Sequence, residues 1–380
     1  MRIVFWLNIL SPHQIPYIKY MAEDVRVKKV ICVAADDISY KRKEMGWNVP
    51  QISKNSKMEV FINPSVATIK SLFSEAPQES WHLFSGIRGF KFVFKALKIS
   101  IAYNINRGLI TECPNTYAFG LANGKPLWLH KIRFCIQDRK YAKHIKKVYA
   151  IGDKANNYFS SVCSHWEVTP FSYCTEFSNI ILHKNEGNLK TCFVGSLEKW
   201  KSPMSIVRVL ASQSESIKNI EHKFIGKGSE YRRLIKYISE KEIKKIDFLG
   251  TINNSELNVV FSKQDLLILP SIYDGWGAVV NEALQAGLYV ICSDACGASA
   301  LLHDPRCGYV FKAGDLKELE NHLIWCSKNV ETIRSNRAFR MDWAKKSISG
   351  QSISEYMIET LLGHATNCPW LLVGRGEEDK

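Results

Sequence analysis

The sequence predicts an α/β protein in which parallel sheets are built from alternating strands and helices. Short apolar runs alternate with amphipathic segments along 380 residues, and 46% of the residues are hydrophobic. A chain of this length exceeds one ordinary hydrophobic core, so we expect two domains. In such sheets the binding sites lie at the carboxyl ends of the strands.

The first half of the chain alternates apolar runs of strand length with longer segments at helical spacing. We expect strands at 2–10, 28–34, 60–63, 80–85, 108–111 and 147–151. We expect helices at 14–22, 90–104, 127–145 and 154–162. Strand and helix therefore alternate from the start, which is typical of a parallel sheet.

A second series of elements begins after a polar, irregular stretch that contains Pro170. The strands are expected at 190–194, 221–225, 245–249, 265–269, 289–293 and 308–311. The helices are expected at 203–212, 231–240 and 278–286, from 316 onward, and within 329–363. We therefore place an N-terminal domain at 1–165, a linker at 166–189, a C-terminal domain at 190–345, and a returning helix with a tail at 346–380.

The positive charge is concentrated in the first half of the chain. Residues 1–185 hold 26 of the 51 Lys and Arg residues but only 13 of the 37 Asp and Glu residues, a formal charge of +13. The rest of the chain is close to neutral. A basic half indicates a nucleic acid, an anionic membrane surface or a polyanionic substrate as partner.

The composition also bears on location. No apolar run approaches the ~20 residues of a membrane span, and the N-terminal segment has no cleavage site of the signal-peptide kind. The eleven cysteines are scattered without CxxC pairs, which is typical of reduced thiols. We expect a cytoplasmic protein, whose basic half also allows peripheral attachment to the inner face of the plasma membrane.

The most informative stretch is 265–294. A buried strand at 265–269 leads through a turn into the helix at 278–286, and Gly275 and Gly277 remove side chains where that helix begins. The free N–H groups at such a helix start, together with the helix dipole, favour a bound phosphate.

Two acids flank this helix start. The amides of Gly277, Ala278 and Val279 would hold the phosphate, while Asp274 precedes them and Glu282 lies one turn into the helix. Hydroxyls on either side of a diphosphate would then find carboxylate acceptors. A nucleotide sugar has this layout of ribose, diphosphate and sugar.

The stretch resembles the donor site of retaining glycosyltransferases of the GT-B fold, specifically glycosyltransferase family 4. The family signature is a Pro-Ser turn, an acid, Gly-aromatic-Gly, and a Glu after seven intervening residues. The matching residues are Pro270, Ser271, Asp274, Gly275, Trp276, Gly277 and Glu282. Asp274 stands where the family usually carries Glu, which shortens the reach by one methylene. The alternative interpretation is an ordinary strand–loop–helix with surface acids.

The resemblance implies two Rossmann-like domains with parallel sheets facing across a cleft. It also implies a retaining hexosyltransferase without metal or cofactor, which moves a sugar from a UDP- or GDP-linked donor to a glycan or lipid-linked acceptor. Synthesis of a bacterial surface polysaccharide, such as O-antigen or capsule, is the expected setting. In this match Glu282 would hold the ribose, and Asp274 the sugar hydroxyls or the β-phosphate.

A second family motif follows the strand at 190–194. Gly195 and Lys201 match it, but Ser196 stands where the family has an Arg that normally helps to hold the diphosphate. The phosphate must then depend more on Lys201 and the helix amides, and Lys199 in the same loop could compensate. An unremarkable surface lysine is the alternative.

Two weaker glycine loops also resemble the family. The first contains Gly226 and Gly228, which follow the strand at 221–225. The second, residues 249–252, resembles the family loop that lines the nucleobase, so we expect Ile252 beside the base. Plain strand–helix turns are the alternative interpretation.

Three residues of the N-terminal half follow predicted strands and are candidates for the acceptor side. They are His13, Arg88 and Glu112. His13 and Glu112 are expected to join Asp274 and Lys201 in catalysis. The alternatives are a solvated His beside a capping Ser, a surface Arg, and a loop acid that faces water.

Two basic segments, 90–107 and 131–147, mix lysines with apolar residues and could lie on an anionic bilayer. A core-packed helix with a solvated basic face is the alternative. No Asp-x-Asp motif is present, and the spacing of Cys292, Cys296, His303 and Cys307 matches no known zinc site, so we expect no metal.

Two other functions remain open. A GT-B-fold sugar-nucleotide epimerase would share the nucleotide site, although it should carry more acid/base pairs. A non-enzymatic protein that binds polyanions or membranes would explain the basic half but not Asp274 and Glu282. We do not expect nucleic acid as a partner.

Overall fold

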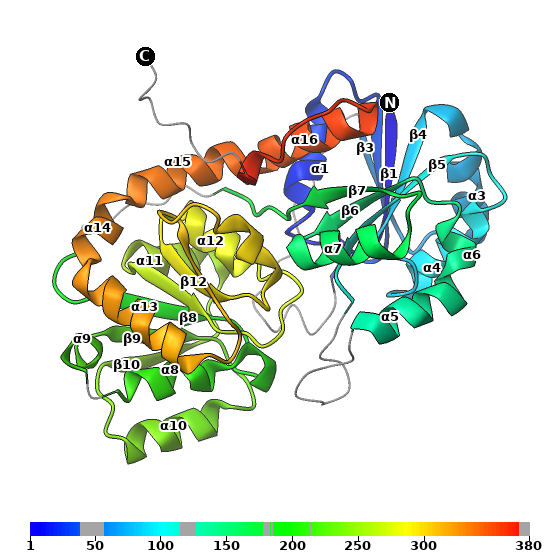
Figure 1. Ribbon diagram of the computed structural model, residues 1–380. Helices are drawn as coiled ribbons and strands as arrows, with labels where there is room; N and C mark the ends of the chain where they lie inside the picture. Colours follow the sequence, from blue (N-terminus) through cyan, green and yellow to red (C-terminus); the bar gives the residue numbers. More distant parts are fainter. Residues whose placement is uncertain (39–56, 115–126, 178–182, 184, 213, 372–380) are drawn as a thin grey trace. The chain divides into compact units, whose positions relative to one another are not determined.

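The computed structural model describes residues 1–38, 57–114, 127–177, 183, 185–212 and 214–371. The chain divides into two compact units (Figure 1). Most of the first unit precedes Phe177, and Ser349–Pro369 completes it, while Phe177–Ile348 forms most of the second.

The first unit contains a seven-stranded sheet in which every pairing is parallel. In sheet order the strands are β3 (Met58–Ile62), β2 (Lys29–Asp36), β1 (Arg2–Ile9), β4 (Ser80–Phe84), β5 (Asn106–Glu112), β6 (Lys147–Ile151) and β7 (Glu167–Phe171). The helices are α1 (Ile15–Glu23), α3 (Val66–Ser74), α4 (Lys91–Ser100), α5 (Leu127–Arg133), α6 (Arg139–Ala142), α7 (Asp153–Val162) and α16 (Gly350–Leu362).

The core of the first unit includes strand β1 in the interior of the sheet. Trp6 is fully buried there, and its ring stacks on Phe73 at 4.8 Å and on Phe84 at 5.8 Å between centroids. Its indole N–H donates to His82 Nδ1 over 3.2 Å. Burial lowers the pKa of His82 to about 3, so this imidazole stays neutral and can accept that bond.

Helix α16, drawn in red in Figure 1, lies beside the blue helix α1 although more than 300 residues separate them. The contact is close because Gly350 has no side chain where it meets the backbone of Pro16. The hydroxyl of Tyr149 lies 2.8 Å from that of Thr360, and the buried ammonium of Lys147 donates to the Thr360 carbonyl. Helix α16 is therefore part of the first unit.

The second unit contains a six-stranded parallel sheet. In sheet order the strands are β10 (Ile246–Gly250), β9 (Glu221–Ile225), β8 (Lys190–Val194), β11 (Leu266–Leu269), β12 (Tyr289–Ser293) and β13 (Gly308–Phe311). The helices are α8 (Pro203–Leu210), α9 (Glu215–Lys218), α10 (Tyr231–Glu240), α11 (Asn254–Ser262), α12 (Val279–Gln285), α13 (Leu316–Lys328), α14 (Val330–Ser335) and α15 (Arg337–Ser347).

The prediction of two α/β units with parallel sheets is confirmed. Strand β7 lies inside 166–189, the stretch predicted as a linker, because Pro170 is tolerated in an edge strand. The long helix predicted at 127–145 is broken by a π-helix, Phe134–Asp138. Helices α3 and α11 were not predicted. Residues 178–182 and 184 of the predicted linker and 372–380 of the tail lie outside the described residues.

Successive loops of the second unit touch at glycines. Gly226 has φ of 132°, and a Cβ there would overlap the carbonyl oxygen of Gly195. The Gly226 amide also donates to the Gly250 carbonyl over 2.7 Å. The loops after β8, β9 and β10 can pass this closely only without a side chain at Gly226.

Replacing Gly226 with Ala should therefore destabilise the second unit by about 2–4 kcal/mol, since backbone strain and a steric clash add. Thermal unfolding monitored by circular dichroism measures the effect. Gly89→Ala is the control, because a Cβ at Gly89 meets nothing within 4 Å. Equal midpoints for the two variants would contradict the close contact.

Candidate active site

The candidate donor site of the second unit lies where the order of the strands reverses. Strands β8 and β11 are neighbours, but the chain leaves β8 toward β9 on one side and continues from β11 toward β12 on the other. In parallel α/β sheets, ligands bind beside such a reversal, at the carboxyl ends of the strands. The loops that follow β8 and β11 carry Lys201 and Asp274.

Backbone hydrogen bonds tie the two loops together. The carbonyl of Trp200 accepts from the amide of Ile272 over 2.8 Å and from that of Tyr273 over 3.3 Å. Lys201 and Asp274, 73 residues apart in sequence, form an ion pair beside this contact. Their side chains are only 18% and 13% exposed. The structure thus brings together two residues that the sequence placed in separate motifs.

The loop around Asp274 is held from the opposite side by the chain after β12. The Asp274 amide donates to the Ala295 carbonyl over 3.2 Å, and Asp274 forms an isolated parallel bridge with Cys296. Gly277 has φ of 92°, and a Cβ there would lie 2.6 Å from Cys296 Sγ and 3.2 Å from Asp274 Oδ2. Glycine is therefore required at 277. Cys296 is a contributor to the site that sequence reasoning missed.

The backbone amides that the sequence predicts to bind a phosphate lie at the start of α12. Among the described residues, the amides of Gly277, Ala278 and Val279 have no backbone acceptor. Helix α12 is short, Val279–Gln285, so the contribution of its dipole is modest. These amides are therefore candidates to bind an anion.

Glu282 lies in the first turn of α12 and keeps part of its surface exposed. Burial of the carboxyl group raises its pKa to about 7. No hydrogen bond or ion pair reaches this carboxyl from the part of the chain that the structure describes. A desolvated acid without a protein partner is typical of a ligand-binding position.

The side chain of Trp276 is not on the surface of the site. It is 3% exposed, and its indole N–H donates to Asn281 Oδ1 over 2.8 Å. The aromatic residue of the Gly-Trp-Gly motif therefore fastens the loop to α12. Any contact with a donor would involve its backbone.

The remaining donor-site candidates lie along the same edge of the sheet. Gly195 and Ser196 follow β8 directly, and the Gly195 amide donates to the Ile225 carbonyl over 2.9 Å. Ile252 follows β10 and is partly buried. Since β9 separates β10 from β8, Ile252 lies two strands from the Lys201 loop.

The candidates in the first unit also share one edge. His13 follows β1, and its ring centroid lies 6.4 Å from that of Tyr173, which follows β7. Glu112 is the last residue of β5 and is partly buried. The Ser11 hydroxyl accepts from the His13 amide, and the first turn of α1 has no side-chain cap.

Arg88 is engaged by other residues of the first unit, which neither interpretation of the sequence anticipated. It pairs with Asp138, and its guanidinium lies over the rings of Phe94 and Tyr141 at 5.4 and 5.6 Å. It also donates to Gln137. Arg88 therefore holds the π-helix against α4.

Helix α4 also fits its alternative, because Val93, Ala96 and Leu97 are buried in the core while its lysines face outward. No helix in the described ranges is long and apolar enough to span a bilayer. The same ranges contain no group of three or more His, Cys, Asp or Glu side chains arranged to hold a metal ion.

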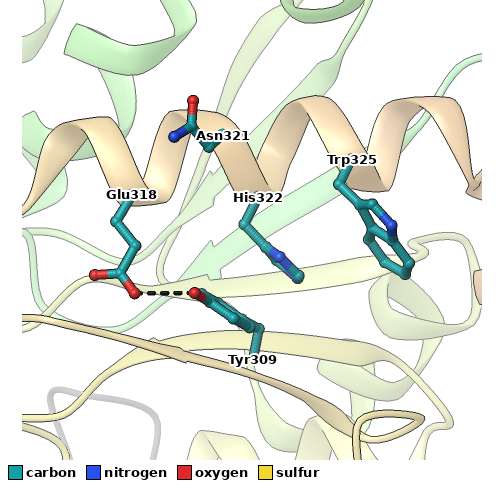
Figure 2. Close-up of a pocket in the computed structure, with 5 residues that line it drawn as sticks. All are labelled: Tyr309, Glu318, Asn321, His322 and Trp325. Carbon is teal, nitrogen blue, oxygen red and sulfur yellow. Dashed lines mark hydrogen bonds between the residues drawn. The ribbon is translucent and has the colours of Figure 1, made fainter.

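A cavity of about 290 Å³ in the second unit is lined by none of the predicted site residues (Figure 2). Tyr309 from β13 forms one wall, and Glu318, Asn321, His322 and Trp325 from α13 form the other. The rings of Tyr309 and His322 stack at 3.9 Å, and Tyr309 donates to Glu318 over 2.9 Å. These contacts pack α13 on the edge strand β13.

Residues 175–342 match the family model of the glycosyl transferases group 1. The match covers the second unit, including the Lys201 and Asp274 loops and α12. This part of the chain is therefore similar to that family.

Curated relatives match over shorter stretches. An uncharacterized glycosyltransferase of Methanocaldococcus jannaschii, MJ1069, is 26% identical over 152 residues, 39% of this chain and 38% of that protein. The alpha-monoglucosyldiacylglycerol synthase of Acholeplasma laidlawii is 27% identical over 197 residues, 50% of this chain and 49% of that protein. The lipopolysaccharide glucosyltransferase WaaG of Escherichia coli K12 is 24% identical over 141 residues, which are 37% of this chain and 36% of that protein. The chain thus aligns with less than half of the length of each.

Solved structures are similar over nearly the whole chain. Anabaena Alr3699/HepE, crystallised with UDP, has a TM-score of 0.66 at 16% identity and covers 96% of this chain and 100% of its own. The lipopolysaccharide outer core galactosyltransferase WaaB in its apo form has a TM-score of 0.68 at 13% identity, with 96% and 99% covered. At these identities the likeness shows the fold, which is of the predicted GT-B type.

The raised pKa of Glu282 predicts a pH-dependent loss of stability. Below about pH 4.5 the carboxyl is protonated in both the folded and the unfolded state. Between pH 4.5 and 7 only the unfolded state ionises freely, so the folded state loses up to roughly 3 kcal/mol. Glu282→Gln should therefore gain stability over the wild type as pH rises from 5 to 8.

Thermal unfolding at pH 5 and pH 8 measures this difference. Glu240→Gln is the control, because Glu240 is exposed on α10. Parallel pH curves for wild type and Glu282→Gln would mean that the Glu282 carboxyl is hydrated.

Proposed function

We propose that this chain is a retaining glycosyltransferase of family 4. It would transfer a sugar from a UDP- or GDP-linked donor to a hydroxyl of a glycan or lipid-linked acceptor. The match of the second unit to the glycosyl transferases group 1 supports this proposal, as do relatives named for glycolipid and lipopolysaccharide glucosyl transfer. A similar fold with UDP bound in HepE supports the choice of donor class.

The observation that carries the proposal is the meeting of Lys201 and Asp274 at the strand-order reversal. A diphosphate bound beside this reversal would find the Lys201 ammonium already oriented by Asp274. The free amides at the start of α12 would take further phosphate oxygens, and Glu282, beyond them, would exchange its unfavourable burial for hydrogen bonds from ribose hydroxyls.

In the reaction, the bond between the anomeric carbon and the β-phosphate oxygen breaks, and the acceptor oxygen bonds to that carbon on the same face. The acceptor proton passes to the departing diphosphate. Lys201 and the helix amides would stabilise the charge that develops there, so no metal is required by the proposal. Asp274, once released from Lys201, would accept hydroxyls of the transferred sugar.

The first unit would supply the acceptor side. Glu112 and His13, each at the carboxyl end of a strand, would contact the acceptor hydroxyl or the donor sugar. We propose that the enzyme works at the cytoplasmic face of the membrane in bacterial surface polysaccharide synthesis. The basic charge of the first 185 residues supports a phosphate-bearing or membrane-bound acceptor.

Lys201→Ala should lower the rate of transfer about 10²–10³-fold, the loss expected when one group that stabilises the departing charge is removed. Turnover of a panel of nucleotide sugars, followed by nucleotide release, measures this effect. Lys263→Ala is the matched control, because Lys263 is exposed in the same unit. Full activity in Lys201→Ala would refute the phosphate assignment, and a sugar altered without any acceptor would indicate an epimerase.

A further inference from the structure

A cavity of about 350 Å³ in the first unit is lined by α5 and α7. Trp128 and Lys131 come from α5. The lining residues of α7 share one face of that helix and are Lys154, Asn157, Tyr158 and Ser161. The functional assignments above use none of these residues.

The cavity lies toward the edge of the sheet that carries Glu112. Glu112 pairs with Ile151, the last residue of β6, and α7 begins two residues later. Lys154 lies in the first turn of α7 and is therefore near the Glu112 end of this edge. The cavity therefore adjoins the acceptor side of the proposed site.

The charges in the cavity are not compensated by the surrounding protein. Among the described residues, no carboxylate pairs with Lys131 or Lys154. Asp138, whose charge acts on Tyr158, is engaged by Arg88. Two ammonium groups that line one cavity repel each other, so an anion with several oxygens would be held between them. The Asn157 amide and the Ser161 hydroxyl add further polar groups.

An apolar strip continues from the cavity along α5 into the π-helix. It consists of Trp128, Ile132 and Ile136, which are 58%, 48% and 77% exposed. Residues at this spacing lie along one side of a helix. Large apolar side chains exposed beside a cationic cavity match an amphiphile, which has an anionic head and an apolar chain.

We propose that the α5–α7 cavity binds the phosphate-bearing head of a lipid acceptor, whose chain lies along Trp128, Ile132 and Ile136. The inference rests on the proposed function and narrows its acceptor to a lipid phosphate. Lys131 and Lys154 hold the phosphate, and Trp128 contacts both head and chain. The acceptor is thereby anchored near Glu112.

Decyl phosphate, a single phosphate on an apolar chain, is the probe, and calorimetric titration of the full chain measures its binding. Inorganic phosphate and decyl glucoside are the two comparison ligands. Decyl phosphate should bind about tenfold or more tightly than either, because each of them lacks one of the two contacts. Equal binding of decyl glucoside overturns the phosphate head, and equal binding of inorganic phosphate overturns the apolar strip.

Variants locate the site. Lys131→Ala with Lys154→Ala should weaken decyl phosphate binding about tenfold or more, and Ile136→Ser should weaken it without changing the binding of inorganic phosphate. Lys91→Ala with Lys95→Ala is the control, because it also removes two positive charges, from the exposed face of α4 in the same unit. Unchanged affinity in the double lysine variant would overturn the proposal.

UDP titrated into the same proteins separates this inference from the proposed function. UDP should bind the wild type and the double lysine variant equally, since Lys201 and Glu282 belong to the other unit. A wild type that binds decyl phosphate but not UDP would refute the donor site alone. A wild type that binds UDP but not decyl phosphate would refute this inference alone.

Discussion

The carbonyl of Trp200 accepts hydrogen bonds from the amides of Ile272 and Tyr273, and this contact fixes the loop after β8 against the loop after β11. Both loops leave the sheet where the strand order reverses, so nothing in the sheet itself would hold them together. The contact sets Lys201 beside Asp274, and the other features of the donor site are arranged around that pair.

The candidate donor site combines a tightly packed backbone with a carboxyl group, that of Glu282, whose burial is unfavourable. Gly277 allows the turn to lie against Cys296, and the buried indole of Trp276 fastens it to α12. The Glu282 carboxyl, by contrast, is desolvated, and no described residue forms a hydrogen bond or ion pair with it. A rigid frame around an unsatisfied acceptor is the arrangement expected of a preorganised ligand site, because the ligand supplies the missing hydrogen bonds.

The basic residues of the first half of the chain have different surroundings in different helices. On α4 the lysines face outward while the apolar residues fill the core, and Arg88 is used to hold the π-helix. At α5 and α7, Lys131 and Lys154 line a cavity beside exposed apolar side chains. The net charge does not distinguish lysines on a solvent-exposed helix face from lysines that line a cavity. Only packing determines which face of a basic helix is buried.

The sequence by itself determined the two series of parallel strands, since buried strands are continuous apolar runs whose length and spacing are local properties. It also identified the Asp274–Glu282 motif, because the glycines and acids of one turn lie close together in the chain. It missed β7, where Pro170 conceals an edge strand.

Only the tertiary structure decided that Lys201 meets Asp274, that Trp276 is buried and that Arg88 is occupied by Asp138. These pairings join residues far apart in the chain. They depend on which strands become neighbours and how the following loops turn, and no local pattern encodes that.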